Sequence, residues 1–274
     1  MLKLLLCASA CMVAATAHAE LPAKFAEKGK LVVANTPNYP PMEYRDPATN
    51  ELMGVDIDLG AALAKQLGTE IEWSEIGFEQ MVSSLNTGRV DLILSGMSDL
   101  PARRETMDFV DYMRSGAQFY TSTKNAAEIK EMTDFCGKKV GMSRRTSFPD
   151  EAAKWSAANC EANGKPALEI VGTEGSADAR TQLKQGRLDG AVQGSETLPY
   201  LTELEPDTYV IIGEPFTEVY QGIGFSKQEP ELRDAFAAAL AELIKSGEYK
   251  AIFDKYKLAG SMVDAPLING EAVK

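Results

Sequence analysis

Histidine is nearly missing from this sequence of 274 residues, which contains only His18. Residue 18 falls in an N-terminal segment with the pattern of a removable signal, so the remaining chain has no imidazole. That absence excludes Ser-His-Asp and Cys-His catalysis, which both depend on a histidine base. It also excludes His-ligated metal sites, and we expect neither a metal nor another cofactor.

Long apolar runs are also lacking. The run near the N-terminus, from Leu4 to about Ala17, is too short to span a bilayer. It follows a lysine and ends in the small-x-small sequence Ala17-His18-Ala19, which predicts a secretory signal peptide over residues 1–19 and a periplasmic mature protein. Cys11 lacks the leucine usually found three residues before a lipidated cysteine, so we do not expect a lipoprotein.

Cysteine is scarce as well. Two of the four cysteines fall within the predicted signal peptide, which leaves Cys136 and Cys160. Two cysteines in an oxidising compartment most simply form one disulfide. The alternative is a pair of free, buried thiols. We therefore predict a disulfide between Cys136 and Cys160.

Basic residues are outnumbered, with 28 Lys and Arg against 40 Asp and Glu and a formal net charge of −12. Such a surface repels phosphate backbones, so we expect no binding to nucleic acid. Tight binding to anionic lipid is excluded on the same ground. The length that remains after residue 19 suggests about two domains, each able to bury its own core.

Short apolar segments alternate with amphipathic helical stretches along the chain, which predicts an α/β fold. One pattern occurs twice, because 85–91 and 183–189 both read Leu-x-x-Gly-Arg-x-Asp and both precede a short apolar strand. In each, the glycine stands where a helix ends in left-handed geometry. Two similar units predict two lobes that face each other. The alternative is two unrelated helix-to-strand turns.

The predicted lobe 1 comprises residues 20–116 and 222–274, and lobe 2 comprises 117–221. Two short crossings near 113–118 and 217–221 would join the lobes and form a hinge. Ligands of open α/β sheets bind beyond the carboxyl ends of the strands, so we expect the cleft to be formed by loops 36–43, 77–79, 95–103, 143–150 and 193–197. The tail, 259–274, contains Pro266 and two glycines and is expected to be loosely attached.

The segment 95–103, Ser-Gly-Met-Ser-Asp-Leu-Pro-Ala-Arg, carries the chemistry of the first lobe. Its small residues, Ser95, Gly96 and Ser98, allow a ligand to approach the backbone closely. Arginine is the side chain suited to bidentate binding of a carboxylate. We therefore predict Arg103 as a carboxylate clamp and expect its neighbour Arg104 to be a solvated surface charge.

Several short motifs follow the order found in a known family. They are Gly96-Met97-Ser98, Pro101, Arg103 and Asp108-Phe109-Val110-Asp111, preceded by Tyr39-Pro40-Pro41-Met42-Glu43-Tyr44, Gly54-Val55-Asp56-Ile57-Asp58-Leu59 and Gly88-Arg89-Val90-Asp91, and followed by Tyr220-Gln221-Gly222-Ile223-Gly224-Phe225. Together they resemble the periplasmic polar-amino-acid-binding proteins of ABC importers. The resemblance covers nearly the whole chain after residue 19.

The resemblance implies a two-lobe, periplasmic-binding-protein-like (type II) α/β fold in which hinge closure buries a small ligand. It also implies a monomer that delivers its ligand to an ABC permease in the inner membrane. The six-residue step from Arg103 to Phe109 matches the family's spacing and selects Arg103 over Arg104.

The family's binding residues can be carried over by position. Its members hold the ligand between aromatic rings, and the matching residues are Tyr39 and Phe78. Ser98 matches the residue that binds the ligand's α-groups. Thr146 and Ser147 match residues at a helix entry whose backbone N–H groups complete the carboxylate site, as expected for anion capture at a helix N-terminus.

Two positions depart from the family's pattern. Gly194 stands where an aspartate usually holds the ligand's ammonium group, and Arg145 stands where a glycine is usual. An unpaired ammonium in a closed cleft is costly, so this predicts a ligand with two acidic groups or an N-substituted amino acid. The alternative is that Glu196 replaces the missing aspartate, Arg145 points to solvent, and an ordinary amino acid binds.

Two other functions remain to be weighed. Cyclohexadienyl dehydratases resemble the same family, and such an enzyme would need a general acid, for which Glu196 is the candidate. A sensory protein that reports to a membrane receptor would bind its ligand in the same way. We expect a binding protein and not an enzyme, because the chain after residue 19 offers no histidine and no evident proton relay.

Overall fold

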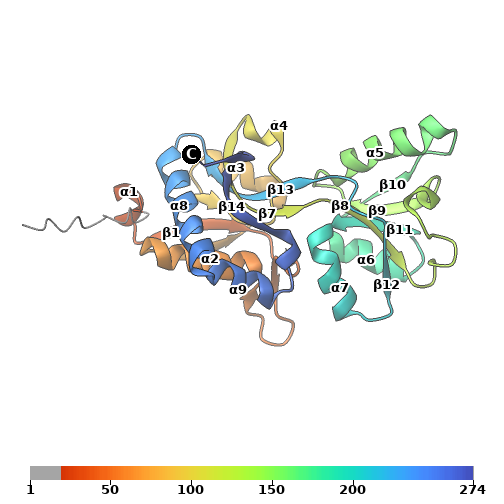
Figure 1. Ribbon diagram of the computed structural model, residues 1–274, viewed down its shortest axis with the longest axis horizontal. Coiled ribbons are helices and arrows are strands. Elements are labelled where there is room, and N and C mark those ends of the chain that lie inside the picture. Colours follow the sequence, from red (N-terminus) through yellow and green to blue (C-terminus); the bar gives the residue numbers. More distant parts are fainter. Residues whose placement is uncertain (1–19, 274) are drawn as a thin grey trace, which may run out of the picture.

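The computed structural model describes residues 20–273. The predicted signal peptide, with Cys11, lies outside the described residues. Figure 1 shows two groups of strands and helices that lie side by side and are joined by extended segments. Among residues 20–273, no helix is both long and apolar enough to cross a membrane.

The first sheet has seven strands in the order β15-β14-β7-β13-β6-β1-β5. Strand β1 is parallel to β5 and β6, whereas β13 is antiparallel to β6 and β7. The strands are β1 (Lys30–Asn35), β5 (Glu70–Glu75), β6 (Leu92–Ile93), β7 (Met107–Ser115), β13 (Val219–Ser226), β14 (Met262–Ile268) and β15 (Glu271–Ala272). A separate ribbon contains β2 (Asn38–Tyr39), β3 (Glu43–Arg45) and β4 (Leu52–Met53).

Helices cover both faces of this sheet. On one face lie α2 (Val55–Leu67), α8 (Pro230–Ser246) and α9 (Glu248–Lys255), and α3 (Met81–Asn86) packs on the other. Helix α2 forms because its buried residues recur at intervals of about four, as in Leu59, Leu63 and Leu67. It ends at Gly68, whose φ of 67° is left-handed. The short helices are α1 (Ala23–Ala26) and α4 (Pro101–Arg104).

The second sheet has five strands in the order β10-β9-β11-β8-β12. They are β8 (Ala117–Ser122), β9 (Lys139–Ser143), β10 (Glu169–Thr173), β11 (Gly190–Gly194) and β12 (Tyr209–Ile212). Its helices are α5 (Phe148–Asn159), α6 (Ser176–Lys184) and α7 (Leu198–Leu204). Single 3-10 turns complete the chain at Phe78–Gln80, Met132–Phe135, Glu161–Asn163, Ser195–Thr197 and Ala259–Ser261.

The predicted disulfide is confirmed. The sulfur atoms of Cys136 and Cys160 are bonded, and their Cα atoms are 5.6 Å apart. The bond joins the segment before β9 to the end of α5, so it closes a loop that contains both elements within lobe 2.

The repeated Leu-x-x-Gly-Arg-x-Asp pattern has the same structure in both sheets. Gly88 and Gly186 have left-handed φ angles of 69° and 70°. Asp91 accepts a hydrogen bond from the backbone N–H of Val32 at 2.9 Å, and Asp189 accepts one from Lys139 at 2.8 Å. Each aspartate thus ties the start of the strand that follows it to a neighbouring parallel strand, β1 in the first sheet and β9 in the second. This agreement favours two equivalent units over two unrelated turns.

Two crossings connect the sheets. The first passes from β7 to β8 through Gly116, and the second enters β13 at Val219. A Cβ atom on Gly116 would overlap the carbonyl oxygen of Thr217, so the two crossings pack directly against each other. The predicted lobe boundaries fall at these crossings, and hinge motion about them stays a prediction.

The prediction of a loosely attached tail is wrong. Strand β14 pairs with β7, the backbone N–H of Gly270 donates to Asp111 at 2.8 Å, and Asn269 accepts from the N–H of Phe109 at 2.8 Å. The tail covers an edge of β7 that would otherwise expose unpaired backbone groups. Proline and glycine in the tail shape a strand and its turn and do not release the segment.

Candidate ligand-binding cleft

A cleft of about 930 Å³, including its open mouth, lies between the two lobes. Four of the five predicted loops contribute to it, together with residues 174–176, Val192 and Gln221. The predicted site residues that line it are Tyr39, Phe78, Ser95, Gly96, Ser98, Arg103, Arg145, Thr146 and Ser147. Gly194 and Glu196 lie behind its wall.

Arg103 projects toward the cleft from α4, which begins at Pro101. One guanidinium nitrogen donates to the carbonyl oxygen of Ser98 at 2.7 Å, and the guanidinium carbon lies 5.6 Å from the centre of the Phe78 ring. Among residues 20–273, no carboxylate forms an ion pair with it. Burial lowers the pKa of the Arg103 guanidinium, which nevertheless stays charged. Its remaining donors are placed to receive an anion.

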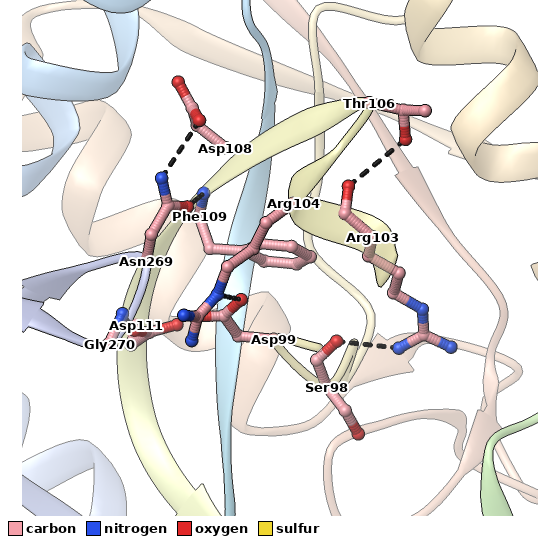
Figure 2. A network of polar contacts seen from close by, with 10 residues as sticks. All are labelled: Ser98, Asp99, Arg103, Arg104, Thr106, Asp108, Phe109, Asp111, Asn269 and Gly270. Carbon is pink, nitrogen blue, oxygen red and sulfur yellow. Dashed lines mark hydrogen bonds and ion pairs between the residues drawn. The ribbon is translucent and has the colours of Figure 1, made fainter. Parts of the chain in front are cut away.

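Figure 2 shows the side chains of Arg103 and Arg104 pointing in different directions, with Arg104 beside Asp99. Arg104 does not line the cleft, and the expectation of a solvated surface charge is wrong because its side chain is 34% exposed and forms an ion pair. Its Nε and Nη2 atoms donate to the two oxygens of Asp99 at 2.5 and 2.7 Å. The Asp99 side chain is fully buried. Successive residues of a helical turn point about 100° apart, so Arg103 faces the cleft while Arg104 faces Asp99 and the C-terminal strands.

The opposite wall of the cleft carries the entrance to α5. Ser147 stands at the N-cap of this twelve-residue helix, and the Thr146 hydroxyl donates to the carbonyl of Ser143 at 2.8 Å. Within the described part of the chain, the backbone N–H of Ser147 has no acceptor. A helix N-terminus attracts negative charge. Arg103 and the start of α5 therefore present donors to the cleft from different lobes.

The Glu196 carboxylate occupies the space that a side chain at position 194 would need. A Cβ atom on Gly194 would overlap both the Tyr39 hydroxyl and a Glu196 oxygen, so a larger residue there would require these two side chains to move. Glu196 is 2% exposed and accepts hydrogen bonds from the Tyr39 hydroxyl at 2.7 Å, from Nε2 of Gln221 at 2.9 Å, and from the Ser115 hydroxyl. Burial raises the pKa of Glu196, and these donors oppose the shift.

Arg145 lines the cleft, but its charge is already compensated. It pairs with Glu79 of lobe 1 at 3.0 Å and with Glu174 of lobe 2 at 3.8 Å, and Arg144 pairs with Glu174 as well. These side chains are 41–58% exposed, and pairs of this kind contribute at most about 1 kcal/mol. The arginine that departs from the family's pattern is thus engaged by two glutamates.

Two buried polar residues that line the cleft were not named as site residues from the sequence. Glu43 is 1% exposed and accepts a hydrogen bond from the Ser95 hydroxyl at 2.7 Å. Burial, and next the charge of Asp56, raise the pKa of Glu43 well above its usual value. Gln221 is 2% exposed and also lines the cleft. Both lay inside the quoted motifs, but no pattern in the sequence marked them as facing a ligand.

Comparison with known proteins places this geometry in a family. Residues 31–259 match the bacterial extracellular solute-binding proteins, family 3, and the chain belongs to this family. The arginine-binding protein ArgT of Corynebacterium glutamicum is 30% identical over 252 residues, which are 92% of this chain and 82% of that protein.

Solved structures agree with the fold. An ancestral arginine-binding protein bound to arginine has a TM-score of 0.74 at 28% identity and covers 83% of this chain and 98% of its own. The ancestral amino-acid-binding protein AncCDT-1, a precursor of cyclohexadienyl dehydratase, has a TM-score of 0.74 at 28% identity and covers 85% and 97%. The predicted family, two-lobe α/β fold and solute-binding function are confirmed, and binding is favoured over the dehydratase.

Proposed function

We propose that this chain is the periplasmic binding component of an ABC importer and that it closes its lobes around one L-α-amino acid without catalysing a reaction. The observation that carries the proposal is Arg103, a partly buried guanidinium with open donors in the cleft. The ligand's carboxylate would bind Arg103, the Ser98 segment and the start of α5. Because these groups come from both lobes, binding would favour the closed state.

An ordinary amino acid is supported by the surroundings of Arg145. Glu79 and Glu174 neutralise this arginine, so a second acidic group on the ligand is not needed to pair it. The named ligands of the relative ArgT and of one similar structure are also arginine. A ligand with two acidic groups, or an N-substituted amino acid, is the competing prediction.

The position of Glu196 supports binding over catalysis. A general acid must lie within hydrogen-bond reach of the atom that it protonates. Glu196 lies behind the cleft wall and already accepts three hydrogen bonds. The test of the dehydratase alternative is to incubate the purified protein with prephenate, whose consumption would contradict the proposed absence of catalysis.

A thermal-shift panel tests the proposed ligand class. The panel contains the twenty L-amino acids, L-cystine, dicarboxylates and N-substituted amino acids, because a ligand that binds the folded state raises the melting temperature. We expect one or a few L-amino acids to stabilise the wild type and the variant Arg89→Ala, whose exposed arginine lies outside the cleft. Stabilisation by dicarboxylates alone would overturn the amino-acid ligand.

The importer partner is tested separately. Proteoliposomes that contain an amino-acid ABC permease from the same organism should hydrolyse ATP faster when the ligand-bound protein is added. A receptor that responds to the loaded protein, with no permease that does, would favour the sensory function instead.

A further inference from the structure

The cleft contains a buried hydrogen-bond acceptor that none of the predicted roles uses. Gln221 is 2% exposed and lines the cleft, and its Oε1 atom has no hydrogen-bond partner among residues 20–273. A buried acceptor without a partner costs about 1–3 kcal/mol. Such a cost is expected where a ligand completes the hydrogen bond.

Glu196 fixes the orientation of this amide. Nε2 of Gln221 donates to Oε1 of Glu196 at 2.9 Å. Rotation of the amide by 180° would place its oxygen against the carboxylate, where two acceptors repel. The Oε1 atom must therefore point away from Glu196 and toward Gly96, where an added Cβ atom would lie 3.5 Å from it. Gly96 itself lines the cleft.

The backbone places Gln221 beside the carboxylate clamp. Ser98 and Gln221 form an antiparallel bridge, and the backbone N–H of Gly222 donates to the carbonyl of Met97 at 3.0 Å. The pairing of β13 with β7 shifts between Gln221 and Gly222, and such bulges redirect side chains. The carboxylate and amino group of an α-amino acid are attached to one carbon, so their binding groups must be neighbours, as Ser98 and Gln221 are.

We propose that Oε1 of Gln221 accepts a hydrogen bond from the ligand's α-amino group, with Glu196 as the positioning residue that holds the amide. This assignment rests on the proposed amino-acid ligand. In this assignment the neutral amide of Gln221 binds the amino group that an aspartate at position 194 would otherwise bind. The chain can therefore bind an amino acid with glycine at position 194. Oε2 of Glu43 is also buried without a hydrogen-bond partner among residues 20–273, but Glu43 is not bridged to Ser98 as Gln221 is.

The test compares two ligands that differ only in the amino group. They are L-arginine and 5-guanidinopentanoate, its counterpart without the amino group, or the tightest-binding L-amino acid of the panel and its deaminated carboxylate. Calorimetry gives the ratio of the two dissociation constants. For the wild type we expect the amino group to improve binding by about 10- to 100-fold.

Three variants distinguish the role of Oε1 of Gln221 from that of the hydrogen bonds around Glu196. Gln221→Met removes Oε1 and also the Nε2 donor to Glu196, with little change in shape. The ratio should fall to about 1–3 if the ligand loses one charge-assisted hydrogen bond. Ser115→Ala removes a different partner of Glu196 and should keep the wild-type ratio. Glu196→Gln keeps an acceptor for the Gln221 amide, so it should lower the ratio less than Gln221→Met does.

Each result decides a different point. An unchanged ratio in Gln221→Met, with amino-acid binding intact, would overturn the Gln221 assignment and leave the proposed function standing. A larger loss in Glu196→Gln than in Gln221→Met would show that Glu196 itself holds the amino group. If the wild type binds no amino acid of the panel, the proposed function fails and the Gln221 assignment fails with it.

Discussion

Arg103 and Arg104 are adjacent in one helical turn, but only Arg104 forms an ion pair with a carboxylate of the described chain. Arg104 has its carboxylate, Asp99, within the chain, and Asp99 lies beside Asp111 and the C-terminal strands. Arg103 has a carbonyl and an aromatic ring, and its open donors face the cleft. A charge that is paired internally contributes to folding, whereas one that is left for a ligand contributes to binding. The two residues therefore offer a direct comparison of structural and functional charge.

The largest expected effect is on binding. Arg103→Ala should weaken the binding of the panel's best amino acid by roughly 100-fold or more, because it removes a desolvated, charge-assisted contact. Calorimetry with Arg89→Ala as the control measures the change. The melting temperature without ligand should stay near that of the wild type. Affinity equal to that of the control would remove Arg103 from the site.

The disulfide takes part in neither the Arg103 nor the Arg104 contacts, so its reduction should affect stability and not binding. Reduction of Cys136–Cys160 should lower the free energy of unfolding by about 3 kcal/mol, because it frees a loop in the unfolded chain. Urea titrations with and without reductant measure the difference. The order of affinities in the ligand panel should not change, and an unchanged unfolding midpoint would contradict a stabilising role.

Arg104→Ala should produce the reverse of Arg103→Ala. Removing the guanidinium leaves the buried Asp99 carboxylate without its cation, which should cost about 2 kcal/mol after allowance for the partial exposure of Arg104. Chemical denaturation measures this loss. Affinity per folded molecule should stay within about threefold of the wild type. A loss of affinity as large as that of Arg103→Ala would contradict the assignment of Arg104 to folding and Arg103 to binding.

The sequence predicted one member of this pair and misjudged the other for a physical reason. The match to the family's motif spacing selected Arg103, and the repeated Gly-Arg-x-Asp pattern identified the two units, because both depend on short stretches of chain. The partner of Arg104 depends on a helical turn directing its side chain toward a buried aspartate. The attached tail depends on strand pairing with β7, about 150 residues earlier in the chain.

The candidate site shows the same limit. The cleft loops followed from the ends of predicted strands, and most of the proposed residues line the cleft. Gln221 was not marked, because its orientation comes from a bulge in β13 pairing and from a hydrogen bond to Glu196. The engagement of Arg145 by Glu79 likewise joins two lobes that are remote in sequence.

The last prediction concerns the pH dependence of stability on the Arg104 side. Burial, and next the charge of Asp99, raise the pKa of Asp111 to about 8. The folded state therefore holds a proton that the unfolded state releases near pH 4, so this group's contribution to stability is complete below pH 4 and is lost as the pH rises toward 8.

Asp111→Asn should remove that loss, because an amide can donate toward Asp99 at every pH and can still accept from the N–H of Gly270. Relative to the wild type, the variant should become more stable by about 4 kcal/mol between pH 5 and pH 8.5. Denaturation at a series of pH values measures the difference. Parallel stability curves would mean that Asp111 ionises normally. Affinity in both proteins should share one pH profile, because Arg103 stays charged throughout this range.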